Sequence, residues 1–199
     1  MDVGDYLKTI EDLTPWQPEL WSGASRPIEI EVGCGKGLFI CSASADHPDR
    51  DFLGIEIAKK YAHFCAARLN KQQSPNAIMM QGDAQPLFKD VIPSKSVDGV
   101  HVYFPDPWWK RRHRKRRIMN KEFITDVYRV LKDGGKLHFW TDVKEYFDVT
   151  LQLLESSFEF KGPLAVDEAQ PTHDLDYRTH FERRMRMHNE PVYRSQFVK

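Results

Sequence analysis

The stretch Ile28-Glu29-Ile30-Glu31-Val32-Gly33-Cys34-Gly35-Lys36-Gly37 decides how this chain of 199 residues folds. Residues 28–32 are typical of a β-strand, and the strand ends where the glycines begin. The three glycines let the backbone approach a ligand at positions where a Cβ would collide with it. Small and apolar side chains at residues 36–45 favour a helix, so the stretch predicts a strand–loop–helix unit.

The same alternation continues along the chain and predicts one α/β domain with a doubly wound, Rossmann-like sheet that is mostly parallel and has helices on both faces. Further strands are predicted at residues 51–57, 77–80, 97–104 and 136–140, and helices at residues 58–70, 120–131 and 143–158. Asp133-Gly134-Gly135 is predicted to end the helix before the last of these strands. A long polar loop follows Pro163, and residues 185–198 are expected to form a short helix and a final strand.

Composition excludes several classes of protein. The chain has 29 basic and 29 acidic residues, so its overall charge predicts no partner. Three cysteines without paired spacing indicate reduced thiols in a cytoplasm-like compartment. No signal pattern and no apolar run long enough for a bilayer is present, so we expect a cytoplasmic protein without a membrane partner. The eight histidines have no metal-ligand spacing, and no metal site is predicted.

Acidic residues follow the predicted strands, and ligands of doubly wound sheets bind at the carboxyl ends of their strands. Glu56 is placed to accept the hydroxyl groups of a ribose, and Asp83 to meet an adenine. A dinucleotide fingerprint would require its third glycine at position 38, where the chain has Leu38, so the loop favours S-adenosylmethionine over NAD. Glu31 could pair with the ammonium group of that cofactor. A tight strand–helix turn without a ligand remains the alternative.

A second motif, Phe104-Pro105-Asp106-Pro107-Trp108-Trp109, follows the strand at residues 97–104. The two prolines restrict the backbone on both sides of Asp106. A rigid carboxylate beside aromatic rings can accept the N1–H and the exocyclic amine of a flipped guanine. The basic run of residues 110–117, Lys-Arg-Arg-His-Arg-Lys-Arg-Arg, comes directly afterwards and indicates contact with a nucleic-acid backbone. A rigid turn with core tryptophans and a solvated charged face are the alternatives.

Thr179-His180-Phe181-Glu182 has the pattern of a capping box, which by itself would only begin a helix. A capped helix start can also present Glu182 to a ligand, so the two interpretations are compatible.

These motifs together resemble one family closely, the bacterial tRNA (guanine-N7-)-methyltransferases. The resemblance runs from about residue 28 to the end of the chain and is most specific in Phe104–Trp108 with the basic run behind it. It is carried by Glu31–Gly37, Gly54-Ile55-Glu56, Phe104–Trp108, Lys110 with Arg112-His113 and Lys115-Arg116-Arg117, Thr141-Asp142, Thr179 with Phe181-Glu182, and Pro191–Arg194. The chain departs from the family pattern at His188-Asn189-Glu190, where a glycine-containing turn is expected, and in its short amino-terminal extension.

The resemblance implies a class I methyltransferase fold, with a seven-stranded sheet that contains one antiparallel strand. It implies S-adenosylmethionine as the methyl donor, S-adenosylhomocysteine as the product, and a guanine N7 in the variable loop of tRNA as the target. It leaves a monomer and a homodimer both open and implies no obligate protein partner. Residues 1–27 would be an amino-terminal extension and residues 162–182 a substrate-binding loop of the single domain.

The resemblance also implies roles for individual residues, with Asp106 as the catalytic residue. Those at the cofactor are Glu31, Gly33, Gly35, Gly37, Glu56, Asp83 and Asp106. Those at the substrate are Lys110, Asp142, Thr179, His180, Phe181 and Glu182. Those at the RNA are Arg112, His113, Arg114, Lys115, Arg116 and Arg117.

Three other functions remain open on the residues alone. One is an RNA-binding module that keeps the fold but has no activity, against which the full set of carboxylates argues. Another is a nicotinamide-dependent oxidoreductase, which the early third glycine and the lack of a Tyr-x-x-x-Lys relay disfavour. The last is a methyltransferase that acts on another RNA or another base atom.

Overall fold

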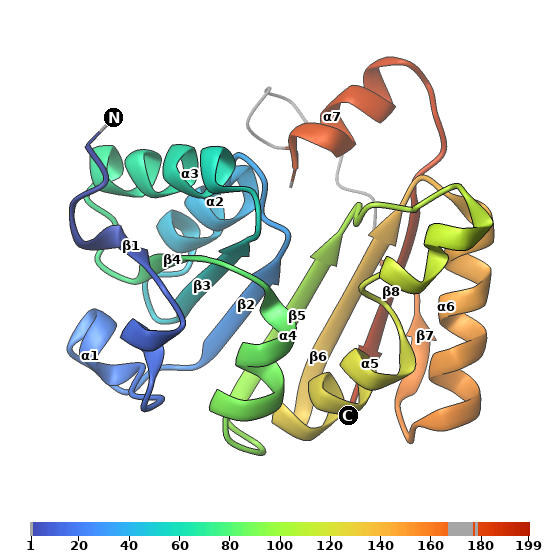
Figure 1. The fold of residues 1–199 in the computed structure, drawn as a ribbon, viewed down its shortest axis with the longest axis horizontal. Helices are drawn as coiled ribbons and strands as arrows, with labels where there is room; N and C mark the ends of the chain where they lie inside the picture. The colour runs from blue at the N-terminus through green and yellow to red at the C-terminus, as the bar shows by residue number, and fades with distance from the viewer. Residues whose placement is uncertain (1, 167–176, 178) are drawn as a thin grey trace.

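The computed structural model describes residues 2–166, 177 and 179–199, which form one mixed sheet with helices on both faces (Figure 1). The strands are β1 (Leu7–Lys8), β2 (Ile28–Val32), β3 (Asp51–Glu56), β4 (Ala77–Gln81), β5 (Val97–Tyr103), β6 (Leu131–Thr141), β7 (Lys161–Leu164) and β8 (Tyr193–Val198). The α-helices are α1 (Glu19–Ser22), α2 (Leu38–Asp46), α3 (Lys59–Gln72), α4 (Ala84–Pro86), α5 (Lys121–Val130), α6 (Lys144–Ser157) and α7 (His180–Met187). Short helical turns are η1 (Gly4–Tyr6), η2 (Glu11–Leu13), η3 (Leu87–Val91) and η4 (Arg111–Arg116).

The strand order is β1-β4-β3-β2-β5-β6-β8-β7, so the predicted doubly wound sheet is confirmed. The strands from β1 to β6 run parallel, whereas β8 runs antiparallel to both of its neighbours. The sheet has one strand more than the resemblance implies. The extra strand is β1, a two-residue strand of the amino-terminal extension that pairs with β4 at the edge.

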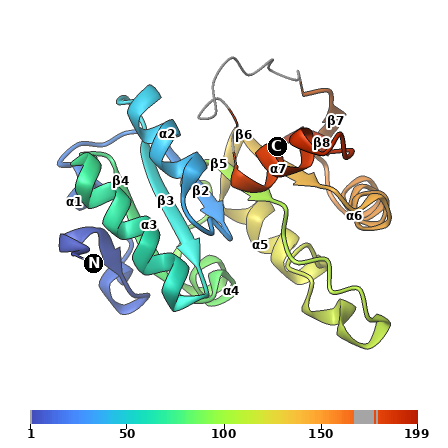
Figure 2. The ribbon, with the colours of Figure 1, turned by 90° about the horizontal axis from the view of Figure 1, so that it is seen from above.

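Different helices cover the two faces of the sheet (Figure 2). On one face, α2 and α3 bury side chains such as Phe39 and Cys65 against β3 and β4. On the other face, α5 and α6 bury side chains such as Phe123 and Leu154 in the larger apolar cluster. The carboxyl ends of the parallel strands lie at the top of Figure 1, below α7.

Two predicted boundaries differ from the structure. Asp133–Gly135 do not separate α5 from the next strand, because β6 already begins at Leu131, which pairs with Val97. The pairing then shifts register, and Gly134 has a φ of 83°, so the glycines form an irregularity within the strand. Segment 162–182 is not one loop, because it begins within β7 and ends within α7; residues 167–176 and 178 lie outside the described part.

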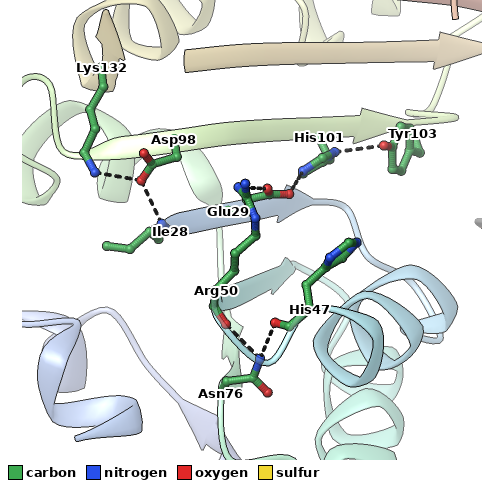
Figure 3. A network of polar contacts seen from close by, with 9 residues as sticks. All are labelled: Ile28, Glu29, His47, Arg50, Asn76, Asp98, His101, Tyr103 and Lys132. Carbon is green, nitrogen blue, oxygen red and sulfur yellow. Dashed lines mark hydrogen bonds and ion pairs between the residues drawn. The ribbon is translucent and has the colours of Figure 1, made fainter. Parts of the chain in front are cut away.

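A network of polar contacts joins the amino ends of the central strands (Figure 3). The Glu29 carboxylate accepts hydrogen bonds from His101 Nε2 and Arg50 Nη1, both at 2.7 Å. Asp98 Oδ2 accepts from the Ile28 amide at 2.8 Å and from Lys132 Nζ at 2.7 Å. A cavity of about 840 Å³ opens beside this network and is lined by none of the predicted site residues. The hydrogen bonds of the network connect β2 to β5.

No helix in the described residues is long and apolar enough to cross a membrane. The three cysteines are free and buried.

Candidate active site

The glycine loop, residues 33–37, connects β2 to α2 in backbone conformations that favour glycine. Gly33 has a φ of 80°, and an added Cβ there would meet no atom within 4 Å, so the loop leaves open space at this point. Gly37 has a φ of 70°, and a Cβ there would lie 2.2 Å from Cys65 Sγ on α3. The early third glycine therefore lets α2 and α3 approach each other closely.

Glu56 at the end of β3 fixes the shape of this loop. Its carboxylate accepts hydrogen bonds from the Gly35 amide at 2.9 Å and from the Ala58 amide at 2.8 Å. Each carboxylate oxygen can accept more than one hydrogen bond, so these contacts leave capacity for ribose hydroxyl groups. The residue predicted to bind the cofactor thus also orders the loop beside it.

Glu31 is a buried carboxyl group beside the glycine loop. It is only 4% exposed, and its Oε2 has no hydrogen-bond partner among the described residues. Burial, with a smaller contribution from the nearby Glu56 carboxylate, raises the pKa of Glu31 to about 8. A buried carboxylate oxygen without a partner is costly, which indicates that a ligand supplies the missing group.

Two cavities meet at the carboxyl ends of the strands, and both are lined by Gly33 and Phe104. The smaller, of about 280 Å³, also contains Glu31. The larger, of about 600 Å³, also contains Glu56, Asp83 and Asp106. These volumes are in the range of small-molecule sites. The carboxylates predicted from separate strands therefore lie around two neighbouring cavities.

The larger cavity is also lined by Ile57 and Ala84, which were not predicted as site residues. Ile57 is 68% exposed although it is apolar and directly follows Glu56. Asp83 begins α4, and its Oδ1 accepts a hydrogen bond from the Gln85 amide at 3.0 Å. An apolar side chain and an ordered turn in the wall of one cavity suit a flat base. In the sequence, the signal for this surface is an isoleucine that directly follows an acidic residue at the end of a predicted strand.

The Asp106 loop, residues 104–108, has an unusual backbone. Phe104 has a φ of 49° and Trp108 a φ of 45°, conformations that non-glycine residues rarely adopt. Asp106 between them is exposed, and its Oδ1 accepts a hydrogen bond from the Trp108 amide at 3.0 Å. Strained backbone of this kind occurs where the surrounding structure holds a side chain for a function.

The basic run forms the turn η4 and packs on Trp108. The Arg116 guanidinium lies 4.9 Å from the centre of the Trp108 ring, and His113 contacts the same ring edge-on at 5.9 Å. Arg112, Arg114, Lys115 and Arg116 are exposed, as phosphate contacts require. Arg117 differs from them, because it is 7% exposed and bonded within the protein.

The helix start predicted at Thr179 is found, with Thr179 as the N-cap of α7. Thr179 Oγ1 accepts a hydrogen bond from the Glu182 amide at 2.9 Å. Thr179, His180 and Phe181 line the smaller cavity, and the Phe181 ring lies 4.8 Å from that of Phe104. The first turn of α7 therefore forms part of the wall of this cavity.

Glu182 is buried and forms an ion pair with a residue that was not predicted. Its Oε1 lies 3.1 Å from Arg194 Nη2 on β8, and the Arg194 guanidinium lies 5.0 Å from the centre of the Trp140 ring. The turn between α7 and β8 contains Asn189 with a φ of 58°. Asparagine tolerates this left-handed conformation, so the departure from a glycine-containing turn keeps the backbone path.

Of the predicted substrate residues, Lys110, Asp142 and Glu182 line neither cavity, although Lys110 and Asp142 lie on segments that follow strands at this end of the sheet. Lys110 is exposed, and Asp142 is half-buried directly after β6. No group of three or more potential metal ligands occurs in the described part of the chain.

The fold agrees with known methyltransferases. The 16S rRNA methyltransferase KamB superposes over 91% of this chain and 92% of its own, with a TM-score of 0.64 and 16% identity. The aminoglycoside resistance methyltransferase NpmB1 covers 95% of this chain and 92% of its own, with a TM-score of 0.60 and 18% identity. At these identities the similarity shows the class I methyltransferase fold alone.

The sequence comparisons go further. Residues 25–195 match a family described as "Putative methyltransferase". The tRNA (guanine-N(7)-)-methyltransferase of Rhodopirellula baltica is 50% identical over 98% of this chain and 74% of its own length. The protein of the same name from an Exiguobacterium species is 32% identical over 98% of this chain and 93% of its own. The chain therefore belongs to the tRNA (guanine-N7-)-methyltransferase family.

Proposed function

We propose that this chain transfers a methyl group from S-adenosylmethionine to N7 of a guanine in tRNA, in the cytoplasm, and that the residues around the two cavities carry the reaction. The variable loop of tRNA is the target region that the resemblance favours. The observation that supports the assignment most strongly is the position of Glu31, a buried carboxyl group with an unpartnered oxygen, beside a glycine loop and next to the cavity of Asp106.

The residues fit the proposed cofactor on the chemistry of their side chains. Glu31 would accept hydrogen bonds from the ammonium group, which gives its unpartnered oxygen a charged donor. Glu56 would accept from the ribose hydroxyl groups while its bond to Gly35 keeps the loop in place. Asp83 would meet the adenine, which Ile57 would cover. When bound, the cofactor supplies an activated methyl group on a positively charged sulfur.

Placement is the main task of the protein in this reaction. Guanine N7 has a free lone pair, so its methylation needs no strong general base. The residues have to hold the methyl carbon and N7 in line at close distance, which can supply much of the rate enhancement. The proximity of Phe104 to both cavities allows the two ligands to meet at this ring.

Asp106 would accept hydrogen bonds from N1–H and the exocyclic amine of the guanine. Glu182, the second acceptor that the resemblance implies, is 5% exposed and paired with Arg194, so its side chain would have to turn toward the cavity to join Asp106. Negative charge at this edge offsets the positive charge that develops on the ring during transfer. Thr179, His180 and Phe181 on α7, with Lys110 and Asp142, would complete the substrate side. Arg112, His113, Arg114, Lys115 and Arg116 would contact the RNA, and the exposed positive charges of the three arginines and Lys115 attract its phosphates.

The direct test is incubation of the purified protein with labelled S-adenosylmethionine and bulk tRNA, followed by nucleoside analysis. We expect 7-methylguanosine. Binding of the cofactor by calorimetry without any methylated nucleoside would instead indicate an RNA-binding module without activity. Methylation at another nucleoside would show that the target atom is wrong.

The Asp106→Asn variant tests the role of the Asp106 loop. An amide keeps the shape but cannot accept both guanine donors, so kcat/KM should fall about a hundredfold or more. Asp49→Asn, an exposed aspartate outside both cavities, is the matched control and should retain activity. An Asp106→Asn enzyme within threefold of the original kcat/KM would overturn the assignment.

A further inference from the structure

Arg117 is set apart from the rest of the basic run by its burial. Its side chain is 8% exposed, whereas that of Arg114, three residues earlier, is 46% exposed. Arg111, Arg112, Lys115 and Arg116 are exposed as well. A phosphate group could not reach Arg117 without displacing protein atoms. Sequence alone gives all of these residues the same appearance.

The contacts of Arg117 occupy its guanidinium group on every side. Nε donates to the carbonyl oxygen of Pro107 at 2.8 Å. Nη1 and Nη2 donate to the two carboxylate oxygens of Glu145 at 3.3 and 2.7 Å. The guanidinium carbon lies 4.4 Å from the centre of the Tyr146 ring. This planar, bidentate geometry is available to arginine and not to lysine.

These contacts connect the Asp106 loop to the core. Pro107 directly follows Asp106, and Glu145 and Tyr146 lie in the first turn of α6. Tyr146 is fully buried, and its hydroxyl group accepts a hydrogen bond from the Met119 amide at 3.1 Å. Arg117 therefore fastens the backbone beside Asp106 to a helix that is itself fixed in the larger apolar cluster.

The Asp106 loop needs such an anchor. Its two positive-φ residues, Phe104 and Trp108, hold a costly backbone conformation that persists only when its surroundings impose it. Asp106 itself is exposed, and its Oδ1 accepts a hydrogen bond from the Trp108 amide, which belongs to the same loop. The bond from Arg117 to Pro107 comes from outside that loop.

We propose that Arg117 is a positioning residue for Asp106, anchored by Glu145, and that it takes no part in binding RNA phosphates. This inference rests on the proposed role of Asp106. Glu145 also accepts from Arg114 at 2.9 Å, so it links the exposed part of the basic run to the same anchor. Arg117 acts on the rate of the reaction, and the exposed arginines act on tRNA affinity.

Arg117→Lys separates these two roles because it keeps the charge and removes the planar fork. We expect kcat to fall tenfold or more, since a displacement of the reacting groups by about 1 Å can cost a hundredfold in rate. The tRNA dissociation constant and its dependence on salt should stay unchanged. A kcat within twofold of the original would overturn the proposal. So would an altered tRNA affinity with kcat retained.

Glu145→Gln is the second variant, and it keeps the buried arginine partnered by one amide oxygen. Removing a negative charge beside the basic run should strengthen tRNA binding on electrostatic grounds alone. The proposal predicts a lower kcat in spite of that stronger binding. Tighter tRNA binding with unchanged kcat would show that Glu145 only modulates the local field, and would overturn the anchor.

Arg112→Gln is the matched control for phosphate contact. It should raise KM for tRNA and reduce the slope of log affinity against log salt by about one unit. Calorimetry with S-adenosylmethionine and a cooperative melting transition establish that each variant is folded. In the Arg117→Lys, Glu145→Gln double variant, kcat should fall no further than in the more affected single variant, because both act through one anchor. Additive losses would contradict this.

The original protein distinguishes failure of this inference from failure of the proposed function. If it forms no 7-methylguanosine, the proposed function fails. If it does, and Arg117→Lys keeps its kcat, the positioning role alone is overturned.

Discussion

Glu29 and Glu31 lie two residues apart on the same face of β2, and the protein treats them in opposite ways. Burial by itself would raise the pKa of Glu29, but hydrogen bonding to His101 and the charges of His101 and Arg50 lower it to about 2. Burial raises the pKa of Glu31 to about 8, and its Oε2 has no partner among the described residues. The carboxylate of Glu29 is paired within the protein, and one oxygen of Glu31 has no hydrogen-bond partner among the described residues.

The two ends of β2 therefore differ in what their acidic side chains contact. At the amino end, Glu29 belongs to a network in which each partner comes from a neighbouring element (Figure 3). At the carboxyl end, Glu31 faces a cavity beside the glycine loop. The cavity of about 840 Å³ beside Glu29 is therefore a weaker candidate for a ligand site than the cavity of about 280 Å³ beside Glu31, because Glu29, Arg50 and His101 in its wall are paired with one another.

The largest expected effect is on cofactor binding. Glu31→Gln should weaken the affinity for S-adenosylmethionine about a hundredfold, because removing one partner of a buried charge pair typically costs 2–5 kcal/mol. Calorimetric titration measures the dissociation constant. Glu29→Gln is the matched control on the same strand and should bind within twofold of the original protein. Equal losses in the two variants would remove the distinction between them.

The second effect is on the stability of the fold, and it is expected in Glu29→Gln. Glu29→Gln should lower the free energy of unfolding by about 2 kcal/mol at pH 7, since it leaves Arg50 and His101 without their anion. The stabilisation that Glu29 provides is complete above the pKa of an unfolded glutamate, about 4, and disappears as the pH falls through about 2. Denaturant unfolding at pH 7 measures the loss. A Glu29→Gln protein as stable as the original would show that the network adds nothing.

The smallest effect is a pH dependence of cofactor binding. Glu31 must be ionised to bind an ammonium group, and in the ligand-free protein its pKa is about 8. Binding therefore releases a proton below that pH, and the affinity should rise about tenfold for each pH unit until it levels off near pH 8. The slope should vanish in Glu31→Gln and persist in Glu29→Gln. A flat profile in the original protein would place the titration elsewhere.

Local patterns were sufficient to predict most of the fold. The strands that begin at Ile28, Asp51, Ala77 and Val97 are found within one residue of their predicted ends, because glycines, prolines and acidic residues terminate them. The edge strands β1 and β7 escaped prediction, since they have only two and four residues and depend on pairing with β4 and β8.

The candidate site was predictable in its carboxylates and not in their partners. Glu31 lies one residue before the end of β2, Glu56 closes β3, and Asp83 and Asp106 follow β4 and β5. Parallel strands bring such positions to one edge of the sheet. The contacts of Arg117 with Glu145 and of Glu182 with Arg194 span 28 and 12 residues. Such pairs depend on how helices pack on the sheet, so no spacing rule reveals them.

Phe104 is part of the wall of both cavities, and its ring contacts that of Phe181 on α7. Any ligand that fixes this ring in one cavity also sets the surface presented to the other. The affinities for cofactor and tRNA are then linked, and thermodynamics requires each ligand to change the affinity for the other by the same factor. Through Phe104, the affinity for tRNA would thus depend on whether the methyl donor is bound.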